Sequence, residues 1–350
     1  MIDSEDPALD LAYTVGVYYY PWYAGDFHGG RYMRKHLQPP QPPSLGEYDD
    51  RVPEVIAQHL QWSRAANVSL WVASWWGPGR REDTTLLRRI LPHEELGDMQ
   101  VALFYETSGR IPEFEDMSNV SADIAHMAAN YFDHANYLRI DGRPVLFVYL
   151  TRVLSRNGVL DEVVARMRNA ATEAGYDIYI VGDQVFGQPT NSSALGLLDG
   201  VTNYDVYGSM GAQGYAGQQK VDAYYAAQSK WQKLANAAGA AFVPAATPGF
   251  NDKGVRDGHP AVSRKLTEKS EPGSLFRAML QQAASYTEPA TEHMLLVTSW
   301  NEWHEDTQIE PVVDAVPTSL DDSDGAYSEG LEYEGYGERY LDILREETTR

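Results

Sequence analysis

Short apolar segments alternate with helical patterns along almost the whole chain, and this alternation limits the folds that the chain can adopt. Several segments are apolar throughout, as strands buried on both faces of a parallel sheet are. The expected strands cover residues 15–19, 69–74, 100–104, 145–149, 178–181, 200–204, 241–245 and 294–298. The expected helices lie between most of them and cover residues 53–67, 84–91, 121–130, 160–174, 218–238, 274–286 and 331–347.

This pattern of about eight strand–helix units predicts an α/β protein with a single (β/α)8 TIM-like barrel, whose active site lies at the C-terminal ends of the strands. The alternative is an open doubly wound sheet, but no Gly-x-Gly-x-x-Gly follows the first expected strand. We expect residues 1–12 to form an acidic N-terminal tail and residues 13–350 to form one catalytic domain. The proline-rich residues 39–43 predict a stiff loop rather than a domain boundary.

Charge and composition argue against several kinds of partner. The chain has 28 Lys and Arg against 50 Asp and Glu, a net charge of -22, so we expect no nucleic acid and no anionic membrane surface as partner. No segment approaches the ~18 apolar residues that cross a bilayer, so we expect no membrane insertion. The absence of cysteine excludes a Cys nucleophile and Cys-ligated metals. We expect a monomer that is either cytoplasmic or exported after loss of a leader.

Aromatic side chains are abundant, with eight Trp and 23 Tyr. Their flat apolar faces and polar tips suit sugars, although packing in the core remains the alternative for any single tyrosine. Many of them stand with carboxylates and amides where the expected strands end, which is where a barrel builds its active site. The candidates for glycan binding are Tyr20, Tyr23, Trp76, Glu106, Tyr204, Tyr207, Asn301, Trp303 and His304.

The strongest chemical signal follows the last expected strand, where Glu302 and Glu305 stand three residues apart. Glycoside hydrolysis uses a pair of carboxyl groups, and in retaining enzymes these lie ~5–5.5 Å apart. Trp303 and His304 could partly desolvate the acid and raise its pKa. The alternative is a solvated acidic loop or a helix N-terminus that favours acidic residues.

Other chemistries have weaker support. Glu302, His304 and Glu305 are possible metal ligands, but the zincin pattern His-Glu-x-x-His is absent. No Gly-x-Ser-x-Gly nucleophile elbow is present either. We therefore expect neither a metal nor another cofactor. His59, within an expected helix, is expected to be a hydrogen-bonded packing residue.

Several segments together resemble glycoside hydrolase family 99, the endo-α-mannosidases and endo-α-1,2-mannanases. They occur in the family's order and span about residues 15–345. The segment Trp300-Asn301-Glu302-Trp303-His304-Glu305, continued by residues 306–311, is highly specific. The others are residues 19–23 (Tyr-Tyr-Pro-Trp-Tyr), 45–48 (Leu-Gly-Glu-Tyr), 53–55 with His59, 74–79 (Ser-Trp-Trp-Gly-Pro-Gly) and 248–252 (Pro-Gly-Phe-Asn-Asp).

The resemblance implies a metal-independent barrel that hydrolyses an internal α-1,2-mannosidic bond with retention, in mannan or N-glycan-type α-mannosides. It implies that Glu302 acts as a base on the substrate's own 2-hydroxyl, which closes onto the anomeric carbon to give a 1,2-anhydro sugar. Glu305 would be the general acid/base, and Asn301 would orient the 2-hydroxyl or Glu302. Glu106 would bind substrate hydroxyls, Trp76 would form the wall of the minus-two subsite, and Tyr204 or Tyr207 would lie near the cleaved bond.

The chain departs from the family's usual pattern in three places. Residues 32–36 replace a usual Trp-x-His-Trp stretch, Asp306 replaces a usual Gly, and the loop 254–257 keeps Arg256 but not its usual neighbours. We expect these changes in the walls of the minus subsites, and they leave the minus-two sugar open. The alternatives are a barrel hydrolase for another α-linked bacterial polysaccharide and a non-catalytic glycan-binding barrel. Binding alone does not require an acid and a base, so intact Glu302 and Glu305 argue against the second.

Overall fold

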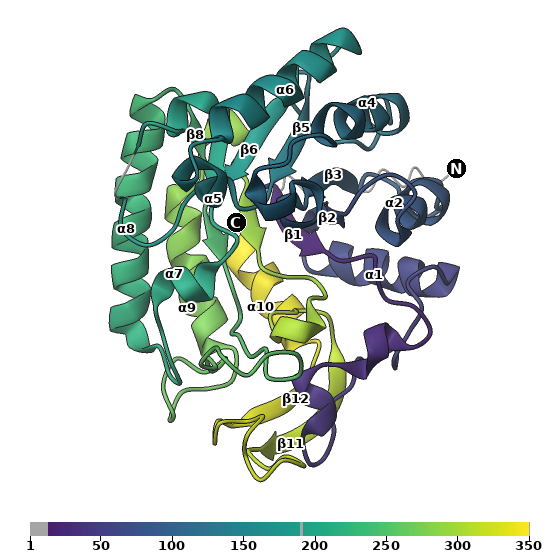
Figure 1. Cartoon of the computed structure of the whole chain (residues 1–350). Coiled ribbons are helices and arrows are strands. Elements are labelled where there is room, and N and C mark those ends of the chain that lie inside the picture. The colour runs from purple at the N-terminus through teal and green to yellow at the C-terminus, as the bar shows by residue number, and fades with distance from the viewer. Residues whose placement is uncertain (1–12, 190–191, 350) are drawn as a thin grey trace, which may run out of the picture.

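A curled sheet of parallel strands forms the centre of the molecule, and helices surround it in the computed structural model (Figure 1). The structure describes residues 13–189 and 192–349. The expected N-terminal tail, residues 1–12, lies outside the described residues. The central strands are β1 (Val15–Tyr19), β2 (Val68–Trp75), β3 (Gln100–Tyr105), β5 (Arg143–Val148), β6 (Tyr179–Asp183), β7 (Gly200–Thr202), β8 (Ala241–Phe242), β9 (Ala245–Ala246) and β10 (Leu295–Val297).

The pairing of these strands closes the sheet into a barrel. Their order is β8-β7-β6-β5-β3-β2-β1-β10-β9, and neighbours pair in parallel. Only Val243 and Pro244 separate β8 from β9, so the two are halves of one extended segment. The first half pairs with β7, and Val243 N donates to Val201 O at 2.9 Å. The second half pairs with β10, and Pro244 O accepts from Leu296 N at 3.0 Å. The (β/α)8 expectation is confirmed.

Most expected helices are present within one to three residues of their expected ends. They are α1 (Pro53–Ala65), α2 (Arg81–Thr85) with η3 (Leu86–Ile90), α4 (Val120–Asn130), α6 (Leu160–Glu173), α8 (Gly217–Ala237) and α9 (Ser274–Ala283) with η6 (Ala284–Tyr286). Three short helices that periodicity did not reveal, α3 (Thr107–Arg110), α5 (Thr151–Arg156) and α7 (Val206–Met210), follow strand ends. Among residues 13–189 and 192–349, no helix combines the length and the apolarity needed to cross a bilayer.

The last expected helix, 331–347, begins too early in our prediction. Residues Tyr333–Gly337 form strand β12, which pairs antiparallel with β11 (Val312–Thr318), and the helix α10 covers Arg339–Thr348. Gly335 permits this hairpin, because a Cβ there would lie 2.1 Å from Val313 O. Gly337 has φ 53°, a conformation that glycine adopts without steric cost and that ends the strand before α10. Figure 1 shows the hairpin at one end of the barrel, beside the N-terminal segment that follows β1.

Aromatic side chains fill the barrel interior beneath the strand ends. The ring centroids of Tyr18 and Phe104 are 4.8 Å apart, and those of Tyr18 and Tyr204 are 4.9 Å apart. All three residues are buried. Contacts at these separations fix the positions of the rings. The barrel interior beneath the candidate functional side chains is therefore well packed.

Candidate active site

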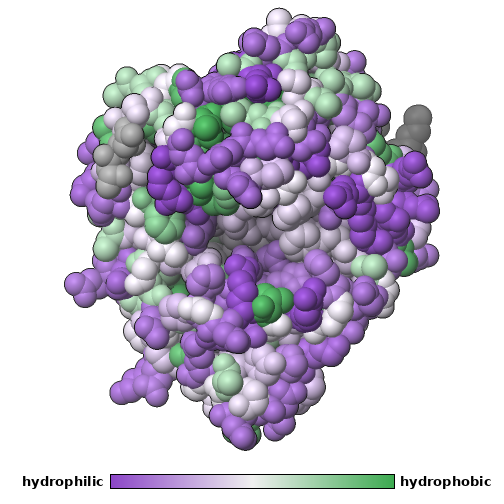
Figure 2. All heavy atoms as spheres, viewed as in Figure 1, coloured by the Kyte–Doolittle hydropathy of each residue, from purple (hydrophilic) through white to green (hydrophobic). Residues whose placement is uncertain are grey.

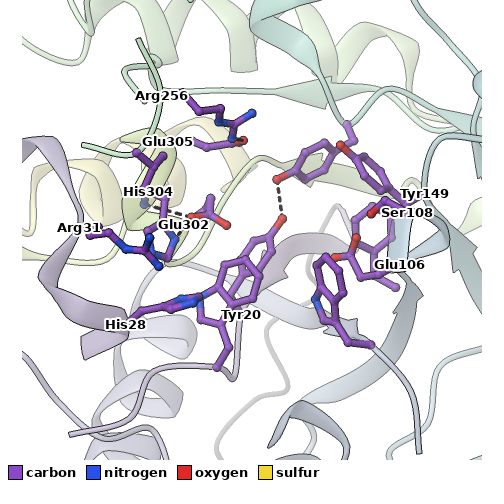
Figure 3. A pocket seen from close by; sticks show the side chains of 15 residues that line it. Tyr20, His28, Arg31, Glu106, Ser108, Tyr149, Arg256, Glu302, His304 and Glu305 are labelled. Carbon is purple, nitrogen blue, oxygen red and sulfur yellow. Dashed lines mark hydrogen bonds and ion pairs between the residues drawn. The ribbon is translucent and has the colours of Figure 1, made fainter. Parts of the chain in front are cut away.

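A cavity of about 490 Å³ opens where the strands end (Figure 3). Its lining comes from the ends of β1, β2, β3, β5, β7, β9 and β10 and from the loops that follow them. The lining residues are Tyr20, Trp22, His28, Arg31, Trp76, Phe104, Glu106, Ser108, Tyr149, Tyr204, Val255, Arg256, Glu302, His304 and Glu305.

One tight turn after β10 carries both candidate catalytic carboxylates into this cavity. Residues Trp303–Glu305 form the 3-10 turn η8, and Glu302 caps its N-terminus by accepting from His304 N at 3.0 Å. Ser299 Oγ accepts from Glu302 N at 2.8 Å and so fixes the start of the turn. In Figure 3 the carboxylates of Glu302 and Glu305 face the same space, with Glu106 on the opposite wall.

The two carboxylates have different surroundings. Two nitrogens of His304 contact Glu302 Oε1: the backbone N donates to it at 3.0 Å, and Nδ1 lies 2.8 Å away. With a proton on Nδ1, the ring also donates to the carboxylate. Glu305 Oε1 instead accepts from Arg256 Nη2 at 2.8 Å. Burial and the nearby charge of Glu302 raise the pKa of Glu305, and Arg256 opposes part of that rise. The two groups therefore differ: Glu302 is hydrogen-bonded to His304, whereas burial and a neighbouring charge favour the protonated form of Glu305.

Glu106, at the end of β3, forms the opposite wall with Trp76. Burial raises the pKa of Glu106 to about 8, although the hydroxyl of Ser74 donates to its Oε1 at 2.6 Å. Trp76 Nε1 donates to the same hydroxyl at 2.9 Å. This chain of hydrogen bonds holds the indole ring in one orientation, as a wall on which a sugar ring can stack.

Tyr20 and Tyr204 both line the cavity, and their hydroxyl groups share a hydrogen bond. The Tyr20 ring centroid lies 4.6 Å from that of Trp22, which in turn lies 6.4 Å from that of Trp76. The structure thus brings seven of the candidates to one cavity. They are Tyr20, Trp76, Glu106, Tyr204, Glu302, His304 and Glu305.

The other four candidates do not line the cavity, and three of them support the turn that carries Glu302 and Glu305. The amide of Asn301 accepts from Tyr20 N at 2.7 Å and donates to Tyr20 O at 3.1 Å, so it joins the turn to the end of β1. Tyr23 Oη donates to Asn301 O at 2.8 Å and accepts from Trp303 N at 3.1 Å. The fourth candidate, Tyr207, stacks on Phe250 instead.

Behind the turn, Trp303 and His59 belong to one buried network. Trp303 Nε1 donates to Glu310 Oε2 at 2.8 Å, and His59 Nε2 lies 3.1 Å from Glu310 Oε1. The other ring nitrogen of His59 lies 3.0 Å from Tyr19 Oη, and His59 is fully buried. The expectation that His59 is a hydrogen-bonded packing residue is confirmed.

Sequence reasoning did not nominate several lining residues. Tyr149 directly follows β5, so the rule that strand ends carry the site could have found it. His28 and Arg31 come from the long loop between β1 and α1. Residues Phe27–Gly30 of that loop all have positive φ, from 46° to 72°, and no hydrophobic period predicts such a turn. The resemblance to the family singles out Arg256 but does not show that it contacts Glu305. That contact depends on how the loop of Arg256 folds.

Arg34 and Asp306, which we expected in the walls of the minus subsites, lie outside the cavity lining and bind each other. Both are buried, and Arg264 Nη2 also donates to Asp306 O at 2.8 Å. Burial by itself would raise the pKa of Asp306, but Arg264 and Arg34 hold it below its ordinary value. Two departures from the family pattern are therefore the two halves of one buried ion pair. Asp306 has φ 49°, a conformation that also explains how glycine can occupy this position.

Glu302, His304 and Glu305 are engaged by protein groups rather than gathered around a common point. Among residues 13–189 and 192–349, no three His, Asp or Glu side chains are placed so that they could hold a metal ion. The arrangement offers proton donors and acceptors, aromatic stacking surfaces and hydroxyl groups, which are the groups that recognise and cleave glycans.

Comparison with known proteins identifies the family. The sequence profile of Glycosyl hydrolase family 99 matches residues 40–344. The chain belongs to glycosyl hydrolase family 99. It is a glycoside hydrolase, and the resemblance found in the sequence is confirmed.

The relatives of this family 99 chain include animal and bacterial proteins. The glycoprotein endo-alpha-1,2-mannosidase of Mus musculus is 23% identical over 341 residues, which cover 87% of this chain and 69% of that protein. The structure of the endo-alpha-mannosidase from Bacteroides thetaiotaomicron, in complex with bis-tris-propane, is similar with a TM-score of 0.67 and 22% identity over 95% of each chain. An uncharacterised protein of Xanthomonas campestris is 24% identical over 79% of this chain and 41% of its own length.

Proposed function

We propose that this glycoside hydrolase is a retaining, endo-acting α-mannosidase that cleaves an internal α-1,2-mannosidic bond with participation of the substrate's 2-hydroxyl. Its relatives named endo-alpha-1,2-mannosidase and endo-alpha-mannosidase support the substrate class. The observation that carries the mechanism is the single turn from Glu302 to Glu305, which presents two carboxylates in different surroundings to one cavity.

In the first step Glu302 takes the proton of the 2-hydroxyl, and O2 attacks the anomeric carbon. The bond from that carbon to the leaving oxygen breaks, and Glu305 gives its proton to that oxygen. The product is a 1,2-anhydro sugar. The raised pKa of Glu305 keeps the required proton in place near neutral pH.

In the second step Glu305, now ionised, takes a proton from water as the water oxygen attacks the anomeric carbon. The epoxide opens, and the protonated Glu302 returns its proton to O2. Two inversions give net retention, and both carboxyl groups end in the protonation states in which they began. An axial 2-hydroxyl, as in mannose, lies opposite an α leaving group and can make this displacement.

Conventional double displacement requires one carboxylate to reach the anomeric carbon from the face opposite the leaving group. Glu302 and Glu305 share one turn of three residues, so they approach a bound sugar from the same side of the cavity. This placement favours a nucleophile supplied by the substrate over a glycosylated Glu302.

Mass spectrometry after incubation with an activated 2-fluoro α-mannoside tests the mechanism. We expect no covalent adduct and no turnover of 2-deoxy or 2-fluoro substrates, since they lack the reacting hydroxyl. A stable adduct on Glu302 would establish double displacement instead. Product analysis on α-1,2-linked mannan tests the substrate class: internal cleavage releasing oligosaccharides with the α configuration is expected, and release of single mannose units contradicts it.

A further inference from the structure

A second cavity of about 490 Å³ lies apart from the active site, where the chain enters α1 and along α2 and η3. We propose that this cavity binds a tetrahedral oxyanion of the phosphate class. Four arginines line it, and no carboxylate does. The lining residues are Arg51, Gly79, Arg81, Thr84, Arg88 and Arg89.

This cavity is positively charged, whereas the whole chain carries a net negative charge. Acidic residues outnumber basic ones by 50 to 28, so carboxylates are available to neutralise surface arginines. Asp49 Oδ1 and Asp50 Oδ1 do accept from Arg81 Nη2, at 2.6 and 2.8 Å, but neither carboxylate lines the cavity. The other three arginines of the lining form no ion pair with any residue in the described part of the chain. An anion inside the cavity would relieve their mutual repulsion.

Two of the arginines are held in place with part of their donor capacity unused. Arg51 donates through Nε to Thr85 Oγ1 at 3.0 Å and through Nη2 to Thr84 Oγ1 at 2.6 Å. The hydrogen bonds of Arg81 are all made by Nη2, so its Nη1 meets no acceptor among the described residues. A guanidinium fixed on one side and open on the other is prepared to bind a planar or tetrahedral oxyanion.

The other two arginines are exposed on η3. Arg88 and Arg89 have neither a hydrogen bond nor an ion pair to any residue of 13–189 or 192–349, so both side chains are available to a ligand. Figure 2 shows strongly hydrophilic surface where Figure 1 draws α2, which leads directly into η3. Two fixed and two adaptable guanidinium groups around one space match a dianion better than a neutral sugar.

The arginine cavity is connected to the active site through the loop after β2. Trp76, in the wall of the active site, and Gly79, in the wall of the arginine cavity, lie three residues apart in that loop. Arg81 also donates to the backbone oxygen of Tyr23, which supports the catalytic turn. The oxyanion can therefore be free phosphate or a phosphate ester on the glycan chain. The second source, unlike the first, rests on the function proposed above.

Calorimetric titration with inorganic phosphate, carried out at fixed ionic strength, tests the site itself. The variant is Arg88→Gln/Arg89→Gln, and the matched control is Arg166→Gln/Arg345→Gln, which removes two exposed arginines from α6 and α10. We expect ~10-fold or greater loss of phosphate affinity in the first variant and no change in the control, because charge-assisted hydrogen bonds are removed only in the first. Equal affinity in all three proteins, or no binding to the wild type, overturns the proposal.

A comparison of the cleavage rates of mannan and phosphomannan distinguishes free phosphate from a phosphate ester on the glycan. Faster cleavage of phosphomannan by the wild type, lost in Arg88→Gln/Arg89→Gln while neutral mannan is cleaved as before, assigns the site to the glycan. Equal cleavage of both polymers with phosphate binding retained assigns it to the free anion. If no α-mannan is cleaved but phosphate still binds with the expected difference between variants, the proposed function fails and the oxyanion site stands.

Discussion

Glu302 and Glu305 have identical side chains and stand three residues apart. Their surroundings are what differ. His304 is hydrogen-bonded to Glu302, whereas burial and the charge of Glu302 raise the pKa of Glu305. Arg256 Nη2 donates to Glu305 at 2.8 Å, and its charge opposes part of the rise in the pKa of Glu305. The proposed roles of base and acid therefore depend on single contacts, each of which a substitution can remove.

Removal of the acid tests the role of Glu305. Glu305→Gln should lower kcat on natural glycans about 10²–10⁴-fold, the range typical for loss of general acid/base help. An aryl mannoside with a good leaving group should recover part of the first step, because its oxygen does not require protonation. Steady-state kinetics on both substrates give the measurement, with Glu162→Gln on the exposed face of α6 as control. Turnover of natural glycans close to that of the wild type would refute the assignment.

We expect the contact between Arg256 and Glu305 to influence the alkaline limit of activity. The guanidinium favours the charged carboxylate, so Arg256→Met should raise the pKa of Glu305 further. The acid then keeps its proton to higher pH, and the alkaline limb of kcat/KM should move upward by roughly 0.5–1 pH unit, a modest shift because Arg256 is half exposed. A limb that stays in place, or moves to lower pH, contradicts this role. Arg166→Met serves as the control.

Trp76 is expected to act in binding rather than in the chemical step. Trp76→Ala should raise KM roughly tenfold with little change in kcat, since stacking on a remote sugar is present in ground and transition states alike. Trp76→Phe keeps an aromatic face but loses the hydrogen bond to Ser74, so it should retain most of the affinity. A fall in kcat with unchanged KM would show that Trp76 acts by fixing Glu106 instead.

At the scale of elements, the turn after β10 is held from three directions. Asn301 ties it to the end of β1, Trp303 ties it to Glu310, and Asp306 ties it to Arg34 and Arg264. A 3-10 turn of three residues has little stability of its own. These contacts to other elements therefore hold the two carboxylates in their positions relative to each other.

The buried charge cluster around Asp306 should dominate the stability of this region. Asp306→Ala leaves Arg34 and Arg264 buried without a counter-charge, which should cost about 3–5 kcal/mol of unfolding free energy. Urea denaturation measures the loss. The control is Glu162→Ala, which breaks an exposed pair with Arg166 on α6 and should cost less than about 1 kcal/mol. Similar losses in both variants would show that the cluster contributes no more than a surface pair.

At the scale of the whole molecule, closure of the barrel brings distant segments to one rim. Tyr20, Glu106 and Glu305 meet at one cavity although nearly the whole sequence separates the first from the last. All groups proposed for catalysis come from this chain and are already engaged with protein partners. Activity should therefore persist after exhaustive dialysis against EDTA, measured as kcat on mannan. A loss of activity that one divalent ion restores would revive a metal role for Glu302, His304 and Glu305.

The sequence by itself determined the barrel, the family and the position of the carboxylate pair. Those features depend on local order: short apolar strands alternating with helices, and a motif whose residues are neighbours in the chain. The extra hairpin escaped prediction, because the close approach of Gly335 to β11 is a tertiary contact. The sequence also did not show that Asn301 and Tyr23 lie outside the cavity lining and hold the turn that carries Glu302 and Glu305.

Only the tertiary structure decided which side chains share a space. Arg34 and Asp306 stand 272 positions apart, and no local pattern shows that they form one buried ion pair. Arg256 meets Glu305 across 49 positions, and the arginines around Gly79 gather because Arg51, just before α1, is hydrogen-bonded to Thr84 and Thr85 of α2. Electrostatic energy depends on distance and burial rather than on sequence separation. The proton affinity of Glu305 and the charge of the second cavity are therefore consequences of folding that the sequence alone does not reveal.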